Sequence, residues 1–352
     1  MDDMVQTNKK IALLHRYPKD RIKETNAAFP YLIYNDKMDF DYRPGAVNYW
    51  PQYRMDILTF KKFDRLSGWK KHLKSLLWII YAPMLVVSKR YDVIYCDDSY
   101  PFYPAIVKMV SPRSKVVLRI GDFHLMYYFS GLAYKVLHFF ERISWIMADE
   151  IITISEAMAD HIEAEIGRRP KVVLDPVDPK DFTLKPLYDD GSVMFHGTLT
   201  RNKNVDVLLE CARLLPDVDF IVIGDGPDLP RLKSLAPFNV FFDGWIPFHK
   251  IHERIATCSV GVALRSENPG NKYVVTSPFL QYGIMGKPCL VTRRKVFGDY
   301  KWQFTGAEEM AEKLKVLLMT PWEEGQKLRE YILENHNVEK IAEEIWAILL
   351  SQ

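Results

Sequence analysis

The chain has 352 residues, 48% of them hydrophobic and 26% charged, with a formal net charge of +2. This composition is typical of a globular protein of about two domains, and the near-neutral charge argues against nucleic acid as a partner. No apolar run reaches the roughly 18 residues that a membrane-spanning helix needs. The polar start predicts no secretion signal. Four well-separated cysteines predict reduced thiols in a cytosolic protein.

The first half of the chain alternates short apolar runs with helical segments. We expect strands within 9–18, 91–98, 114–122, 150–155 and 171–177, and one long helix over about 125–147. β-rich runs separated by helices indicate βα units and a parallel sheet.

The segment 61–90 carries the sharpest charge bias, with eight basic residues and one acid. Large apolar side chains lie between the lysines, as in a helix at the surface of an anionic membrane. The predicted membrane-contacting residues are Trp69, Lys70, Lys71, Lys74 and Trp78. The alternative is an ordinary amphipathic helix packed on a sheet. The membrane interpretation predicts a cytoplasmic protein bound peripherally to the inner face of the membrane.

The proline-rich segment 175–186 reads as a linker, after which a second series begins. Strands are expected within 192–197, 219–226, 239–245, 259–265 and 288–292, with helices near 203–215, 228–235, 247–256, 307–318 and 323–350. Another helix is expected to begin in "TSPFLQYGIMGKP", with Ser277 as N-cap and Pro278 at the first helical position.

Five stretches carry a family resemblance: "FHGTLTRNKNVDVLLECARLL", "FIVIGDGPDLPRL", "VFFDGW", "LQYGIMGKPCLV" and "ADEIITISEAMADHI". In order and spacing they resemble GT-B glycosyltransferases, especially family 4, over most of 90–350. The resemblance implies an α/β fold of two Rossmann-like doubly wound domains facing a cleft. The expected domains are 1–180, which meets the acceptor and the membrane, and 187–335, which binds the donor; a C-terminal helix, 336–352, packs back on the first domain.

The resemblance also implies a nucleotide-diphosphate sugar donor, UDP- or GDP-linked, with no metal or other cofactor. Its diphosphate would lie between Gly197-Thr198 and Ser277-Pro278. A helix N-terminus presents free N–H groups to an anion, and glycine lets the backbone approach closely. The full predicted donor-binding set is Gly197, Thr198, Arg201, Lys203, Gly224, Gly226, Gly244, Trp245, Lys272, Tyr273, Ser277, Pro278 and Gln281.

Several of these residues have a plainer structural interpretation. Gly197, Gly224 and Gly226 could simply turn the chain, and Lys203 could be a solvated lysine. Trp245 is expected either beside the nucleotide base, as in the family, or in the core.

The chain departs from the family at two glutamates that retaining family 4 enzymes carry around this helix. The matching positions are Tyr273 and Gln281. Gln281 could still hydrogen-bond a ribose hydroxyl, or it could be a core-edge residue bonded to backbone. "LQY" also resembles the inverting glucuronosyltransferase of xanthan assembly, although Pro278 replaces the lysine there. Lys272 or Arg265 could supply that charge.

An inverting reaction needs a general base for the acceptor hydroxyl. In GT-B enzymes this base belongs to the first domain, and the candidate here is Asp122, with His124 as second choice. The alternatives are a helix cap for Asp122 and a non-catalytic histidine.

The sequence therefore predicts a glycosyltransferase that moves a sugar to a lipid-linked saccharide or another envelope glycan, with inversion preferred over retention. The rivals are a retaining family 4-type enzyme, a sugar-nucleotide epimerase, and a degenerate protein that only binds a nucleotide-sugar.

Overall fold

The computed structural model describes residues 9–15, 55–58, 83–84, 86–97, 102–182 and 190–351. The chain divides into two compact units. The N-terminal unit comprises Met1–Asp175 and Val338–Gln352, and the C-terminal unit comprises Pro176–Asn337. All five predicted membrane-contacting residues, Trp69 to Trp78, lie outside the described residues. Among the residues that are described, no helix is both long and apolar enough to cross a bilayer.

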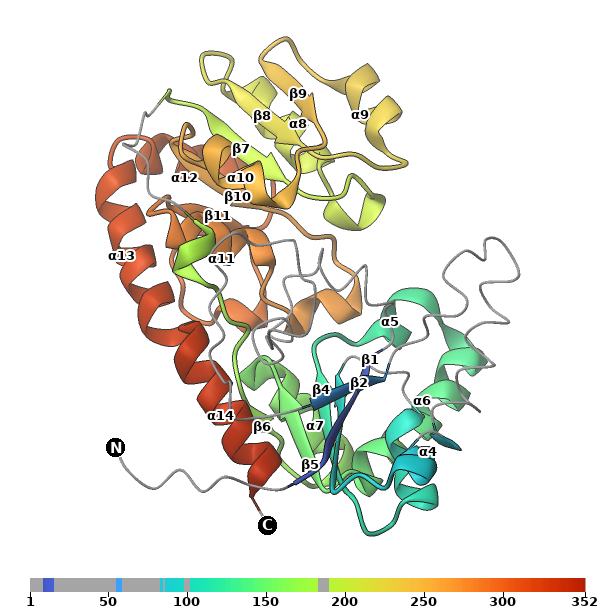
Figure 1. Ribbon diagram of the computed structural model, residues 1–352. Coiled ribbons are helices and arrows are strands. Elements are labelled where there is room, and N and C mark those ends of the chain that lie inside the picture. The colour runs from blue at the N-terminus through green and yellow to red at the C-terminus, as the bar shows by residue number, and fades with distance from the viewer. Residues whose placement is uncertain are drawn as a thin grey trace. The chain divides into compact units, whose positions relative to one another are not determined.

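The N-terminal unit is built on a parallel sheet with the order β2-β1-β3-β4-β5-β6 (Figure 1). Its described strands are β1 (Ile11–His15), β2 (Met55–Leu58), β3 (Val93–Asp97), β4 (Lys115–Ile120), β5 (Glu150–Thr153) and β6 (Lys171–Val172). Its described helices include α4 (Tyr103–Val110), α5 (His124–Tyr128), α6 (Gly131–Met147), α7 (Glu156–Ile166) and α14 (Val338–Leu350).

Helix α14 returns from the end of the chain to complete the core of the N-terminal unit. Its apolar side chains Ile341, Ile345 and Trp346 pack with Tyr95 and Val117 of the sheet. The ammonium groups of two sheet residues then satisfy carbonyls at the end of α14: Lys115 Nζ donates to Ile348 O (2.7 Å) and Lys9 Nζ to Leu350 O (2.8 Å). A cation at a helix C-terminus also complements the helix dipole. The predicted return of the C-terminal helix is thereby confirmed.

The C-terminal unit holds a second parallel sheet, with the order β12-β11-β10-β7-β8-β9. The strands are β7 (Val193–His196), β8 (Phe220–Ile223), β9 (Val240–Gly244), β10 (Val260–Ala263), β11 (Cys289–Thr292) and β12 (Gln303–Phe304). The α-helices are α8 (Asp206–Leu214), α9 (Leu229–Leu235), α10 (Phe248–Ile255), α11 (Ser277–Ile284), α12 (Ala307–Leu317) and α13 (Pro321–Asn335).

Two apolar clusters lie on the sheet of the C-terminal unit. One joins the strands to α8 and α12, and the other joins them to α10, α11 and α13. Strands that are covered on both faces are mainly apolar, as β7, β8 and β10 are: every residue of the three is buried, and His196 at the end of β7 is their one polar residue.

The predicted strands are confirmed, but several helices end where the prediction continued them. The expected helix over 125–147 is two helices, α5 and α6, because Phe129 and Ser130 between them are extended; Gly131, the first residue of α6, takes a positive φ of 59°. The segment 323–350 is likewise divided into α13 and α14. Thr276, not Ser277, is the N-cap of α11, so Pro278 occupies the second helical position.

Candidate functional site

The strand order of the C-terminal unit reverses between β7 and β10. Chain order runs outward from β7 through β8 and β9 on one side, and from β10 through β11 and β12 on the other. In open parallel sheets, ligands bind outside the carboxyl ends of the strands at such a switch point. The segments that leave β7 and β10 there are Gly197–Lys203 and Leu264–Ser277, which include most of the predicted donor-binding residues.

Gly224 and Gly226 allow the loops after β7 and β8 to touch through their backbones. A Cβ atom at Gly224 would lie 1.9 Å from the carbonyl oxygen of Gly197, and one at Gly226 would lie 2.3 Å from that of Leu199. The loops are joined by Leu199 N–H to Asp225 O (2.9 Å) and by Gly197 N–H to Ile223 O (3.0 Å). These two glycines therefore fix the position of the loop at Gly197. This is a larger role than the chain turn that the sequence analysis gave as the alternative.

Lys203 lies over Gly197 in the same loop. A Cβ atom built on Gly197 would lie 3.9 Å from Cε of Lys203, and Gly197 itself takes a φ of 153°. Lys203 ends a 3₁₀ turn (Arg201–Lys203) that Asn204 closes in the left-handed conformation. The half-buried lysine thus places a positive charge beside exposed backbone at the switch point.

His196, the last residue of β7, lies buried beside this charge. Burial, and secondly the charge of Lys203, lower the pKa of His196 to about 3. The ring is therefore neutral at physiological pH and packs edge-on against Tyr282, with 5.0 Å between ring centroids. Its Nε2 atom is buried and has no hydrogen-bond partner among the described residues. Sequence analysis did not single out this histidine.

Hydrogen bonds of Asn202 join the loop after β7 to the loop after β10. Its side-chain oxygen accepts from Asn271 Nδ2 (2.8 Å) and lies 2.8 Å from Ser266 Oγ. Its carbonyl accepts from Ser266 N–H (2.9 Å). Asn271 is only 2% exposed. These contacts join the two sides of the switch point, and sequence analysis missed them although Asn202 lies inside the quoted "TLTRNKN".

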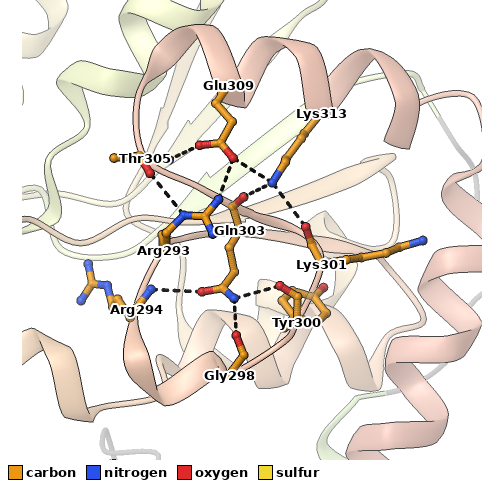
Figure 2. A network of polar contacts seen from close by, with 9 residues as sticks. All are labelled: Arg293, Arg294, Gly298, Tyr300, Lys301, Gln303, Thr305, Glu309 and Lys313. Atoms are coloured by element: carbon orange, nitrogen blue, oxygen red, sulfur yellow. Dashed lines mark hydrogen bonds and ion pairs between the residues drawn. The ribbon is translucent and has the colours of Figure 1, made fainter.

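A polar network formed by residues after β11 holds Arg294, which contacts Asn271 and so supports the hydrogen bonds of Asn202 (Figure 2). Arg294 donates through Nη1 to the carbonyl of Asn271 (2.8 Å), and its own N–H donates to Gln303 Oε1 (3.1 Å). The amide of the buried Gln303 also donates to the carbonyls of Gly298 (2.8 Å) and Tyr300 (2.9 Å). A fully satisfied buried network gives the loop one defined conformation.

Tyr282 packs helix α11 against the sheet. The fully buried phenol donates to Met194 O (2.8 Å) of β7, and its ring fills the space beside Gly261 of β10, where an added Cβ would lie 2.2 Å from a ring carbon. On its other side, α11 lies close to α13 at Gly283, where a Cβ would lie 2.6 Å from Ile332. These contacts bring the start of α11 to the carboxyl ends of β7 and β10.

The start of α11 carries polar groups that the described protein does not satisfy. The amides of Val275, Thr276 and Ser277 donate to no described residue, and Thr276 Oγ1 is buried without a partner among those residues. Gln281 is 4% exposed, and its side-chain amide makes no hydrogen bond with the described residues. Gln281 is thus a residue at the edge of the core, and its contact with a ribose stays a prediction. Unsatisfied buried polar groups are costly, so their gathering at a helix N-terminus indicates a polar ligand.

The other predicted donor-binding residues lie around this centre. Trp245 follows Gly244 at the carboxyl end of β9 and is 70% exposed, which excludes the alternative of a core residue. Arg201 pairs with Asp228 (3.2 Å), which in turn is bound by Arg231. Thr198 and Lys272 are exposed, and Tyr273 is half-buried in the 3₁₀ turn before α11.

The two predicted catalytic residues lie in the N-terminal unit, at the carboxyl end of β4. Asp122 and His124 are both half-buried, and the N-cap of α5 is Phe123, so Asp122 does not hold the capping position. Arg119, three residues earlier on β4, is buried and paired with Asp175. In the described parts of the chain, no three His, Cys, Asp or Glu side chains gather as a metal site.

Comparison with known proteins identifies the fold. No protein-family model and no curated protein matches the sequence. Among solved structures, sucrose-phosphate synthase from Thermosynechococcus elongatus is similar over 97% of this chain and 98% of its own, with a TM-score of 0.71 and 13% identity. The lipopolysaccharide outer core galactosyltransferase WaaB matches over 97% and 100%, with a TM-score of 0.59 and 15% identity.

A third similar structure is S. aureus TarM, solved in complex with UDP; it matches over 79% of this chain and 59% of its own, with a TM-score of 0.64 and 17% identity. The chain has the GT-B fold of two Rossmann-like units, as the sequence resemblance implied.

Proposed function

We propose that the protein is a glycosyltransferase that transfers a sugar from a nucleotide-diphosphate donor. The observation that carries the proposal is the set of unsatisfied polar groups at the switch point of the C-terminal unit. Thr276 Oγ1 and His196 Nε2 are buried without hydrogen-bond partners among the described residues, and the 4% exposed Gln281 lies on the same helix as the proposed ribose contact. A diphosphate bound at the amides of Val275, Thr276 and Ser277, at the start of α11, and a ribose beside Gln281 would satisfy such groups.

Charge and shape support the same ligand. Lys203 supplies a counter-charge to a diphosphate beside the glycine backbone of the first loop. Trp245 offers an exposed aromatic ring at the end of β9, on which a nucleotide base could stack. UDP is the preferred nucleotide, since the similar TarM structure contains it, and GDP is the alternative.

We further propose an inverting reaction on a lipid-linked or other envelope glycan. The position of the first family glutamate is Tyr273 and that of the second is Gln281, which leaves no carboxylate pair for the retaining mechanism. Asp122, at the carboxyl end of β4, would take the proton of the acceptor hydroxyl. The free amides of α11 and Lys203 would stabilise the leaving diphosphate. The acceptor class is favoured by the basic, aromatic segment 61–90 and by the structural similarity to WaaB, a galactosyltransferase of the lipopolysaccharide outer core.

A thermal-shift panel tests the donor. A ligand that binds only the folded state raises its stability, by about 2.7 kcal/mol at one hundred times Kd. We expect a shift with UDP or GDP and with one of their sugars, and no shift with the corresponding nucleoside. A well-folded protein that responds to no nucleotide would leave only the non-enzymatic alternative. Release of a free sugar epimer without acceptor would favour an epimerase.

A further inference from the structure

Helices α5 and α6 of the N-terminal unit expose a continuous series of large apolar side chains. We call these residues the α6 outer face: Tyr128, Phe129, Leu132, Val136, Phe139, Phe140 and Ile146. Leu132 and Tyr128 are each 78% exposed, and Phe139 is 59% exposed. Scattered exposed apolar residues are ordinary, but a contiguous set marks a contact surface.

The polarity of α6 is the reverse of that of an ordinary surface helix. The side chains at 132, 136, 139, 140, 143 and 146 recur at helical spacing, so they share the face that points away from the core. The opposite face carries the polar groups: Glu141 is buried and lies 2.9 Å from Nδ1 of His138, and the buried Ser144 hydroxyl accepts from Ala105 N–H of α4 (3.3 Å). The helix therefore exposes an apolar stripe and buries one carboxylate on an inner face that it shares with the buried Trp145.

The charges on these helices favour an anionic partner. Between 123 and 148 the only acidic residue is Glu141, which is buried. Lys135 is exposed along one edge of the outer face, and Arg142 on the same edge is 43% exposed and pairs with Glu165 of α7 (3.3 Å). The same unit contains the segment 61–90, with eight basic residues and one acid. An apolar stripe that has an exposed lysine at its edge and whose own helix exposes no acid matches the interface of an anionic bilayer.

A protein partner is less well matched to this face. Protein interfaces carry about one hydrogen bond per 100–200 Å², whereas the outer face presents little besides hydrocarbon and aromatic rings. Five of its seven residues lie on α6, which packs against α4, α5 and α7 (Figure 1). Aromatic rings and long aliphatic chains of this kind partition into the lipid headgroup region.

We propose that the α6 outer face is the surface by which this protein docks on an anionic lipid bilayer, with α6 lying in the plane of the interface. The inference deepens the proposed function, and only its statement about the acceptor rests on that function. Helix α6 begins nine residues after Asp122, so docking would bring the proposed base to a lipid-linked saccharide. Binding to lipid is itself independent of the glycosyl transfer.

Fluorescence of a single introduced cysteine tests the docking directly. The natural cysteines, Cys96, Cys211, Cys258 and Cys289, are all buried, so Phe139→Cys can be labelled selectively with an environment-sensitive dye. Phe238→Cys is the control, since Phe238 is 81% exposed and lies in the other unit. With phosphatidylcholine vesicles containing about 30% phosphatidylglycerol, we expect a blue shift at 139 and none at 238. The shift should weaken as salt is added.

Two results would overturn the proposal. One is an unchanged spectrum at 139 on anionic vesicles. The other is failure of Phe139→Cys to label in vesicle-free protein while Phe238→Cys labels, because this would show that protein covers the outer face.

A sedimentation experiment supplies a second, independent measurement. The double variant Val136→Asp/Phe140→Asp should bind anionic vesicles about tenfold more weakly than the natural protein, because carboxylates replace buried apolar area, while Phe238→Asp should bind normally. Nucleotide binding by thermal shift should stay unchanged in the double variant, which separates failure of docking from failure of the proposed donor site. Equal sedimentation of the double variant and the natural protein would refute docking through this face. A concentration-dependent dimer that the double variant abolishes would assign the face to a second copy and would also refute it.

Discussion

Replacing Lys203 by alanine probes the proposed donor site through two independent measurements. Lys203 lies with its Cε 3.9 Å from the Cβ position of Gly197, and its charge lowers the pKa of the buried His196. A charge-assisted hydrogen bond contributes about 1.5–3 kcal/mol. Lys203→Ala should therefore weaken the binding of a nucleoside diphosphate by about ten- to 150-fold, as measured by calorimetry.

The second measurement needs no ligand. Because the Lys203 charge disfavours a second positive charge nearby, its removal should raise the pKa of His196 above its value of about 3, although burial, the larger cause, remains. Titration of the His196 ring by NMR measures this. Lys315→Ala is the matched control: it removes the same charge from an exposed position on α12 and should change neither quantity. Unaltered nucleotide affinity in Lys203→Ala would remove this lysine from the site, and an unaltered pKa of His196 would contradict the geometry of the loop.

The remaining predictions concern the frame of the site, its response to acid and the reaction. Gly224→Ala should destabilise the fold by more than about 2 kcal/mol in urea unfolding, because φ of Gly224 is 140° and the new Cβ would lie 1.9 Å from Gly197 O. Gly191→Ala, with open space around the new Cβ, should cost less stability. Equal losses of stability in the two variants would refute the close approach of the loops. The pKa of His196 lies below its unfolded value, so the unfolded chain gains this proton first as pH falls, and stability should decline between about pH 6.5 and 3. The variant His196→Asn should lose that part of the decline, and an identical pH profile would show that the histidine is not buried as described. Asp122→Asn should abolish sugar transfer while nucleotide binding stays intact; retained transfer would exclude Asp122 as the base.

The sequence was sufficient for five of the six strands of the C-terminal unit because each is a short apolar run, whereas β12 (Gln303–Phe304) is two residues long and half polar and was not predicted. "FHG", "VIGDG" and "FFDG" each mark the carboxyl end of a strand. Their arrangement at one edge follows from parallel pairing alone. Helix ends were less predictable, since Ser277 is the better N-cap by residue type and the structure nevertheless uses Thr276.

The contacts that hold the site together were beyond sequence reasoning because they depend on loop-to-loop geometry. Nothing in the pattern indicates that Asn202 bonds Ser266 and Asn271, some 64 and 69 residues away. Likewise, Gly224 and Gly226 read as turn residues until the carbonyls opposite them are placed. The reversed polarity of α6 was also missed, because an apolar outer stripe and an apolar core stripe have the same period.

Hydrogen exchange on binding a nucleoside diphosphate tests the central claim most directly. The diphosphate is proposed to lie at the start of α11, where the amides of Val275, Thr276 and Ser277 donate to no described residue, and beside the Gly197–Lys203 loop. Saturating UDP or GDP should slow exchange in peptides covering 274–284 and 197–204. Peptides from α12, which contributes Glu309 and Lys313 to the network in Figure 2, should stay unchanged. Binding that leaves exchange in both of these segments unaltered would contradict the proposed donor site.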